Sequence, residues 1–290
     1  MEIVLARDMG FCWGVRRAID IMEKAAADKG EISSLGPIVH NPQVVRDLEG
    51  KGVHITSEPP DGVVGPVAIT AHGVGPQMLE EARARSTEVV DTTCPIVTRS
   101  QRWAKKMAAA GFTVVVFGDP KHREVKGVLA WAGSNAVALG DGDGIPDDLP
   151  ARLAVISQTT QSPERFALFV SELIQKRLGE ISELRVINTL CDATSSQQAA
   201  ARELAQEVDL MLVVGGRSSA NTRHLLEVCR EEGTPAYQIE SAEELRAEWL
   251  QGCQRVGVTA GASTPEFAVE AVVRRVKEIT QELTGTASAN

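Results

Sequence analysis

Cys94 stands where an apolar run gives way to a predicted helix, in the segment VVDTTCPIVTRS (residues 89–100). Pro95 follows it directly, and proline is favoured at the first position inside a helix. The sequence therefore predicts Cys94 at the helix N-cap, among unpaired backbone N–H groups at the positive end of the helix dipole. This environment favours the thiolate over the thiol, and the thiolate is the form that binds metals and acts as a nucleophile.

Two further cysteines repeat this arrangement. Each of the three precedes a polar residue by 28 positions: Cys12 precedes His40, Cys94 precedes His122 and Cys191 precedes Ser219. A third polar segment follows at more variable distance in each case, and these segments are His72, then Gln158-Thr159-Thr160, then Ser263. The repeated spacing indicates a triplication of one structural unit, with one cysteine from each unit directed to a shared centre.

Three cysteines without a fourth nearby partner fit neither a zinc ribbon nor a cluster with four cysteine ligands. The residues alone leave two metal sites open, a zinc ion with one open position or a [4Fe–4S] cluster with one iron left for substrate. Three unrelated buried thiols are the alternative, and the shared spacing disfavours them. Cys229 and Cys253 lie outside the repeat, and we expect them to be packing residues.

Several polar side chains after the predicted strands can donate hydrogen bonds to an anion. They lie near predicted helix starts, where backbone N–H groups also favour phosphate, and they are His40, His72, His122, Ser219, Asn221 and Ser263. Helix capping is the alternative for three of them. Ser263 and Glu266 with Pro265 between them form a capping box, and Asn221 can cap the helix that follows it.

Glu124 is the acidic residue close to a histidine of the repeat, in the segment KHREVKG. In a closed cavity its carboxyl group can donate a proton, with Thr159 and Gln158 orienting it or relaying that proton. The alternative is an exposed first-turn glutamate that stabilises a helix dipole.

Strands and helices must position these residues. Apolar, β-branched runs recur as EIVLA, ISSLGPIV, VHIT, VAIT, EVVD, FTVVVFG, AVALG, LAVIS, LRVIN, LMLVVGG, PAYQIE and RVGVTAG. Amphipathic helical segments such as SPERFALFVSELIQKRL separate many of them, which predicts an α/β fold with mostly parallel sheets. Twelve strands divide into three groups of four counted from the N-terminus. Three such domains around a pseudo-threefold axis would bring the polar ends of their strands to one central cavity.

The 290 residues are 43% hydrophobic, which is typical of an ordinary soluble protein, and the net charge of −9 argues against a nucleic-acid partner. No membrane span or signal peptide is expected, and five cysteines in a long chain favour a reducing, cytoplasmic location. The acidic segment GDGDGIPDDLP (residues 140–150) does not fit a calcium loop and reads as a solvated turn. We expect a frayed tail at residues 283–290.

The motifs GFCWGV, VHNPQVV, AHGV, DTTCPIV, KHREV, SQTT, LCDAT, SSANT and VTAGAS resemble, in this order, those of the 4-hydroxy-3-methylbut-2-enyl diphosphate reductase family. The resemblance runs from Cys12 to Ser263. It implies three α/β domains in a trefoil around a [4Fe–4S] cluster with three cysteine ligands, here Cys12, Cys94 and Cys191, and one open iron. It also implies domains at 13–94, at 95–191, and at 192–282 together with 1–12, so that the first strand joins the third domain.

The same resemblance assigns residue roles. It implies that Glu124 is the catalytic acid and that Thr159 lies beside the substrate hydroxyl. The diphosphate would be bound by His40, His72, His122, Ser219, Asn221 and Ser263, and Thr159 would contribute to substrate binding at the hydroxyl end. Two motifs depart from the family pattern: Arg123 replaces a proline between His122 and Glu124, and Ala220 replaces a serine between Ser219 and Asn221.

The activity implied is a reductive dehydroxylation of an allylic diphosphate by two electrons and protons, giving isopentenyl and dimethylallyl diphosphate. The chain has no Gly-rich nicotinamide fingerprint, so we expect a protein such as ferredoxin or flavodoxin to deliver the electrons. Two other classes of protein stay open at this point: a hydrolase with zinc on the three cysteines, and an iron–sulfur sensor without an anion pocket.

Overall fold

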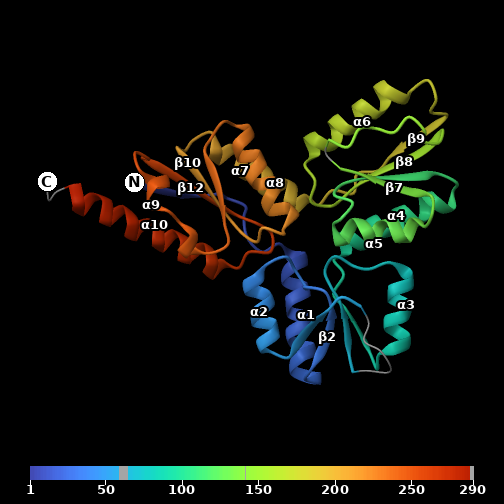
Figure 1. Ribbon diagram of the computed structural model, residues 1–290, viewed down its shortest axis with the longest axis horizontal. Helices are drawn as coiled ribbons and strands as arrows, with labels where there is room; N and C mark the ends of the chain where they lie inside the picture. Colours follow the sequence, from blue (N-terminus) through green and yellow to red (C-terminus); the bar gives the residue numbers. More distant parts are fainter. Residues whose placement is uncertain (59–64, 141, 288–290) are drawn as a thin grey trace. The chain divides into compact units, whose positions relative to one another are not determined.

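The strands form three parallel, four-stranded sheets in a computed structural model of the chain, which describes residues 1–58, 65–140 and 142–287 (Figure 1). Helices connect the strands, so the predicted α/β class is confirmed. The twelve predicted strands all appear among these described residues.

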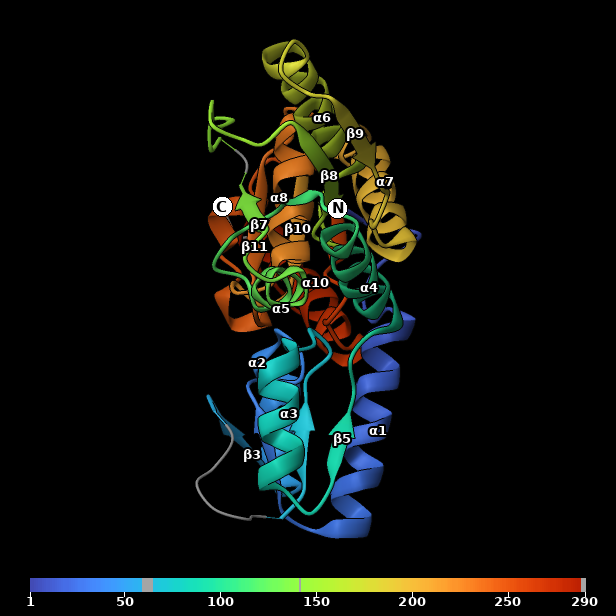
Figure 2. The ribbon, with the colours of Figure 1, turned by 90° about the vertical axis from the view of Figure 1, so that its right-hand side faces the viewer.

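The first sheet has the order β3-β2-β4-β5, and Figure 2 shows β3 and β5 at its two edges. Its strands are β2 (Ile32–Leu35), β3 (Val53–Thr56), β4 (Val67–Ile69) and β5 (Val89–Asp91). The helices of this part of the chain are α1 (Trp13–Lys29), α2 (Pro42–Gly50) and α3 (Pro76–Arg85).

The second sheet has the order β7-β6-β8-β9. Its strands are β6 (Thr113–Phe117), β7 (Ala136–Leu139), β8 (Arg152–Ser157) and β9 (Glu183–Val186). Helices α4 (Pro95–Ala109) and α5 (Arg123–Ala132) cover one face, and α6 (Pro163–Arg177) covers the other (Figure 1).

The third sheet has the order β11-β10-β12-β1. Its strands are β10 (Leu210–Val214), β11 (Ala236–Ile239), β12 (Arg255–Ala260) and the N-terminal β1 (Glu2–Leu5). The helices are α7 (Asp192–Ala205), α8 (Ala220–Glu231), α9 (Ala247–Leu250) and α10 (Glu266–Ala287), with the 3₁₀ helix η1 (Ala242–Glu244).

The three sheets share one topology. In the first two sheets, the first strand along the chain lies between the second and the third, and the third lies next to the fourth; the third sheet has the same order when β10, β11 and β12 are counted as its first three strands and β1 as its fourth. The grouping counted from the N-terminus is wrong by one strand, because β1 pairs with β12 from Glu2 beside Arg255 to Leu5 beside Val258. This pairing agrees with the resemblance, which places the first strand in the last domain.

Both faces of the second and third sheets are buried, which explains their continuous apolar strands. Alternate residues of β6 point to opposite faces: Val115 and Phe117 pack toward Phe169 of α6, whereas Val114 and Val116 pack toward α4 and α5. Such alternation follows from the two-residue period of a strand.

The chain divides into two compact units. The one-sheet unit comprises Met1–Trp13, His40–Val44 and the chain from Asp192 onward; the two-sheet unit comprises Gly14–Val39 and Val45–Cys191. The strands of each sheet fall within the three expected domain ranges, but the ranges themselves stay a prediction. Helix α10 continues to Ala287, so residues 283–287 are helical rather than the start of a frayed tail, and residues 288–290 lie outside the described residues.

Candidate active site

Each of the three cysteines of the repeat forms the same kind of backbone hydrogen bond. Each lies directly before a helix, and its N–H donates to a carbonyl oxygen in the segment after the third strand of the repeat. The pairs are Cys94 with Ala71 at 3.0 Å, Cys191 with Thr159 at 2.9 Å and Cys12 with Ala262 at 3.1 Å. The residues that follow these acceptors are His72, Thr160 and Ser263, so the polar segments predicted from spacing are structurally equivalent.

Cys94 occupies the N-cap of α4, as predicted, with Pro95 at the first helical position. The expectation that this position favours the thiolate is wrong for the protein without a bound metal. Burial raises the pKa of the Cys94 thiol, and this outweighs the lowering by the N–H groups of Ile96 and Val97. The Cys191 thiol and Glu124 raise it further. A cation bound at the sulfur would reverse this balance, because metal coordination deprotonates a thiol.

Two arginines fix the backbone around Cys94 and Cys191 within the two-sheet unit. Arg99, in the second turn of α4, donates through Nη2 to the carbonyl oxygen of Leu190 at 3.0 Å, which ties the Cys191 loop to the helix that Cys94 caps. Arg17 of α1 donates through Nη1 to the carbonyl oxygen of Thr93 at 3.3 Å. Sequence reasoning missed both arginines, because a cation on a helix gives no sequence signal that it binds a distant carbonyl group.

Cys229 and Cys253 have the packing roles expected of them. Cys229 is fully buried in the core, where burial raises the pKa of its thiol to about 12. Cys253 donates through Sγ to the carbonyl oxygen of Trp249 at 3.5 Å.

Glu124 lies in the first turn of α5 and is 2% exposed, so the alternative of an exposed helix-start glutamate is wrong. Its Oε1 accepts from the backbone N–H of Thr159 at 2.7 Å, and its Oε2 accepts from Thr159 Oγ1 at 2.8 Å. The carbonyl oxygen of the same threonine accepts from the N–H of Cys191. Thr159 therefore joins the predicted acid to the loop of a predicted metal ligand.

Burial raises the pKa of Glu124 to about 7, although the two hydrogen bonds from Thr159 act in the opposite direction. A carboxyl group with this pKa is half protonated near neutral pH, as a general acid requires. Arg123, which departs from the family pattern, points elsewhere: its Nη1 donates to the carbonyl oxygen of Leu35 at 3.2 Å. Gly36 makes room for that guanidinium, because a Cβ atom there would overlap it.

Gln158 does not orient Glu124, contrary to one of our expectations. Its Oε1 accepts from the N–H of Asp119 at 3.1 Å, and its Nε2 donates to Thr160 Oγ1 at 3.2 Å. The side chain thus stabilises the loop after β6 rather than the acid.

His72 and His122 meet edge to face within the two-sheet unit, with ring centroids 5.6 Å apart. His122 caps α5, since its Nδ1 accepts from the N–H of Glu124 at 3.2 Å. Nδ1 of His72 lies 3.3 Å from Thr70 Oγ1. An Nδ1 atom that accepts from the backbone leaves the proton of neutral His122 on Nε2, where it can be donated to an anion.

The remaining predicted anion-binding residues lie in the one-sheet unit. Ser219 caps α8 by accepting from the N–H of Thr222 at 3.3 Å, as the capping alternative predicted. Asn221 lies inside the helix instead of capping it, and its Nδ2 donates to Gln197 Oε1 at 3.0 Å. Ser263 is not part of a capping box, because Glu266 is the first residue of α10 rather than its third; the Ser263 hydroxyl donates instead to the carbonyl oxygen of His40 at 3.3 Å.

Gln197 is a second element that the sequence did not reveal. It is buried on α7, and its Nε2 donates to the carbonyl oxygen of Gly10 at 2.8 Å while its Oε1 accepts from Asn221. It therefore connects the loop before Cys12 with the helix start at Asn221. No signal in the sequence distinguishes Gln197 from two further polar residues on the buried side of α7, Thr194 and Gln198.

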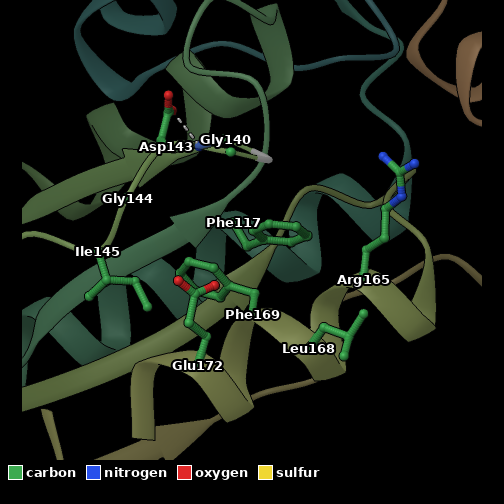
Figure 3. Close-up of a pocket in the computed structure, with 10 residues that line it drawn as sticks. Phe117, Gly140, Asp143, Gly144, Ile145, Arg165, Leu168, Phe169 and Glu172 are labelled. Carbon is green, nitrogen blue, oxygen red and sulfur yellow. Dashed lines mark hydrogen bonds between the residues drawn. The ribbon is translucent and has the colours of Figure 1, made fainter. Parts of the chain in front are cut away.

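A separate pocket in the two-sheet unit contains none of the predicted site residues (Figure 3). Its floor is the stacked pair Phe117 and Phe169, with ring centroids 4.7 Å apart. The loop 140–150 forms one wall, where Asp143 Oδ2 accepts from the N–H of Gly140 at 2.7 Å. This bond supports the prediction of a turn, and residue 141 lies outside the described residues.

None of the helices in the described residues is long and apolar enough to cross a membrane.

Comparison with known proteins gives one consistent result. The family model of the LytB protein matches residues 3–277. Several relatives are named 4-hydroxy-3-methylbut-2-enyl diphosphate reductase. One from Dehalococcoides mccartyi is 47% identical over 94% of this chain and 96% of the relative. One from Geobacter sulfurreducens is 46% identical over 98% of this chain and 100% of the relative. The resemblance read from the motifs is thereby confirmed.

Solved structures agree. One is the structure of (E)-4-hydroxy-3-methyl-but-2-enyl diphosphate reductase, the terminal enzyme of the non-mevalonate pathway, with a TM-score of 0.68 and 36% identity over 96% of this chain and 100% of that one. Another is the E-1-hydroxy-2-methyl-but-2-enyl-4-diphosphate reductase from Plasmodium falciparum, with a TM-score of 0.84 and 27% identity over 94% of this chain and 87% of that one.

Proposed function

Because the chain belongs to the LytB protein family, we propose that it reduces 4-hydroxy-3-methylbut-2-enyl diphosphate to isopentenyl and dimethylallyl diphosphate. The reaction breaks the allylic C–O bond, consumes two electrons and two protons, and releases water. The observation that carries this proposal is the buried carboxyl group of Glu124, which accepts two hydrogen bonds from Thr159. The carbonyl oxygen of Thr159 in turn accepts the backbone N–H of Cys191.

We propose Cys12, Cys94 and Cys191 as the ligands of a [4Fe–4S] cluster with one open iron. In support, the three share the position before a helix and the same backbone hydrogen bond, and Cys94 and Cys191 lie close enough for the charge on one to raise the pKa of the other. Cys12 belongs to the one-sheet unit, so its place in the set rests on the repeat and the resemblance. Such a cluster would pass on electrons from an external donor one at a time and would offer a Lewis-acidic iron for the substrate oxygen.

Glu124 is the proposed proton donor. In the neutral acid the proton lies on Oε2 and points to Thr159 Oγ1, so the hydrogen bond between them runs in the opposite direction from that of the carboxylate. The backbone N–H of Thr159 keeps Oε1 in place in both protonation states. A substrate diphosphate nearby would raise the pKa of Glu124 further by like-charge repulsion.

For the diphosphate we propose two groups of donors, one in each unit. The two-sheet unit contributes His72 and His122, and the one-sheet unit contributes His40, Ser219, Asn221 and Ser263, while Thr159 is proposed to contact the substrate hydroxyl. Neutral histidines and hydroxyl groups donate hydrogen bonds without burying a fixed charge, and the helix starts at Ser219 and His122 add backbone N–H groups. Ala220 offers no hydroxyl group in place of the family's serine, so only backbone donation remains at that position.

We also propose an external ferredoxin or flavodoxin as electron donor, and a cytoplasmic location. The absence of a nicotinamide fingerprint in the sequence supports the former, and an odd number of cysteines, five, in a chain of 290 residues supports the latter.

The test is anaerobic purification followed by an assay with the allylic diphosphate and reduced methyl viologen. We expect a brown protein that forms both products, and loss of iron in Cys94→Ser with normal iron in the matched variant Cys253→Ser. A colourless zinc protein that hydrolyses the substrate would support the hydrolase. A brown protein without turnover would support the sensor.

A further inference from the structure

Helix α4, which begins directly after Cys94, differs in charge from every other helix in the described residues. Its sequence PIVTRSQRWAKKMAA contains four basic and no acidic residues, whereas each of the other described helices contains Asp or Glu. The chain as a whole carries a net charge of −9. The helix is therefore a local cationic surface on an acidic protein.

The four cations, Arg99, Arg102, Lys105 and Lys106, are exposed, and none forms an ion pair with a carboxylate in the part of the chain that the structure describes. Arg99 binds a carbonyl oxygen, and the two lysines lie over Trp131 and Trp103 at 5.3 and 4.7 Å from the ring centroids. Carbonyl groups and aromatic rings leave the charge in place. By contrast, Arg217 binds both Glu240 and Glu244.

The same face has the shape and composition of an interface. A shallow pocket on it is lined by Pro95, Arg99, Arg102, Trp103 and Lys106. A second pocket along the helix includes Arg102, Lys105 and Trp131, together with one carboxylate, Asp91. Tryptophan and arginine are the residues that most often dominate binding energy at protein interfaces.

This face also lies next to two of the proposed cluster ligands. Cys94 caps the helix, and Arg99 binds the carbonyl oxygen of Leu190, the residue before Cys191. A protein bound over α4 would therefore have its redox group close to the sulfur atoms that would hold the cluster.

We propose that the cationic face of α4, formed by Arg99, Arg102, Lys105 and Lys106 around Trp103, is the docking surface for an acidic protein that carries electrons. This inference rests on the proposed reductase activity and names the place where its partner binds. Two one-electron transfers at this surface would supply one turnover, and the carrier would be oxidised. Complementary charge raises the association rate at low ionic strength and favours the correct partner. Reversing the charge of this surface should therefore slow association and weaken the preference for an acidic partner.

The test uses the purified cluster-containing protein with an acidic flavodoxin as probe. The variant Arg102→Glu/Lys106→Glu should weaken flavodoxin binding by about tenfold or more and reduce the dependence of affinity on salt. Turnover with reduced methyl viologen, which needs no docking surface, should be unchanged, as should iron content. The matched control is Arg274→Glu/Lys277→Glu, which makes the same change of net charge on exposed positions of α10 and should retain affinity.

Each other outcome has a definite meaning. Equal affinity of both double variants for flavodoxin would overturn the docking surface while leaving the reductase intact. Absence of turnover with methyl viologen in the unaltered protein would instead refute the proposed function. Tighter binding of duplex DNA than of flavodoxin to α4 would overturn the assignment to a protein carrier. If the charge-reversed protein does not fold, Arg102→Gln/Lys106→Gln must show a smaller loss of affinity in the same direction.

Discussion

The loops after β6 and β10 have the same length and differ in chemistry. His122 and Ser219 each lie five positions after the end of the strand and cap the next helix. Two positions further, Glu124 and Asn221 are both buried in the first turn. Both oxygens of Glu124 accept hydrogen bonds from Thr159, whereas Asn221 donates to Gln197 and its Oδ1 has no partner among the described residues.

The residue that contacts Glu124 also differs between the repeats. Thr159 is equivalent to Ala71 and Ala262, because these three residues accept the N–H of the three cysteines. Alanine at the other two positions has no hydroxyl group to offer. The three repeats therefore share one backbone arrangement. Only the second repeat has the carboxyl group of Glu124 hydrogen-bonded to the hydroxyl group of Thr159 at these positions.

The largest effect should come from removing the acid. Glu124→Gln keeps the shape and one acceptor oxygen for the Thr159 N–H, but it has no proton to transfer. We expect turnover to fall by about 10²–10⁴-fold with cluster absorption unchanged. The control is Glu266→Gln, an exposed glutamate at the start of α10, which should be silent. Near-normal turnover of Glu124→Gln would remove this residue from the mechanism.

The same pair of proteins should differ in the pH dependence of stability. The folded-state pKa of Glu124 is raised to about 7, so between about pH 4.5 and 7 the folded protein binds more protons at this site than the unfolded chain. Its contribution to stability is therefore lost as the pH rises through this window. Relative to Glu124→Gln, the free energy of unfolding should fall by about 3 kcal/mol, measured by urea unfolding at several pH values. Parallel curves would show that Glu124 ionises normally.

Thr159→Val tests the partner of the acid. It removes the hydroxyl donor to Oε2 and keeps the backbone N–H bond to Oε1. Loss of a hydrogen bond to a charged group costs about 1.5–3 kcal/mol, so turnover should fall by about 10–100-fold. Because that bond lowers the pKa of Glu124, its loss should shift the pH profile of kcat to higher pH. An unshifted profile with reduced turnover would indicate a role in substrate contact alone.

Asn221→Asp would place a carboxyl group at the position equivalent to Glu124 without the Thr159 donors. Its carboxylate would face Gln197 Oε1, an acceptor, in a buried setting. We expect the free energy of unfolding to fall by about 1–3 kcal/mol at neutral pH and to recover at low pH, where the carboxyl group is protonated. Unchanged stability at pH 8 would mean that this position accepts a charge as readily as the first turn of α5.

Much of this site could be predicted because the repeat fixes it. The spacing of 28 residues located the three cysteines and the polar residues after β2, β6 and β10, and the alternation of strands and helices predicted the sheets. The partner of β1 could not be obtained from periodicity, since a repeat has no marked starting strand; it came from the family resemblance.

The directions of side chains and the pKa values of buried groups could not be predicted from the sequence. The pKa of Cys94 is set by competition between a helix N-terminus, which is visible in the sequence, and burial, which is not. Arg123 is next to Glu124 in sequence, yet its guanidinium extends to Leu35, where a Cβ atom at position 36 would overlap it. Gln197 and Arg99 act through partners distant in sequence, which no local pattern marks.

The pairing of β1 with β12 sets the order in which the protein can be completed. Glu2 lies beside Arg255, so the first strand leaves the ribosome long before its partner exists, and β1 is an edge strand with β12 as its neighbour in the sheet. Contacts between such distant residues form slowly, because a long loop must close first. The two-sheet unit, made of Gly14–Val39 and Val45–Cys191, can fold during synthesis, whereas Cys12 must wait for β12. The proposed cluster, which would need all three cysteines, could therefore be inserted only after translation has passed residue 260.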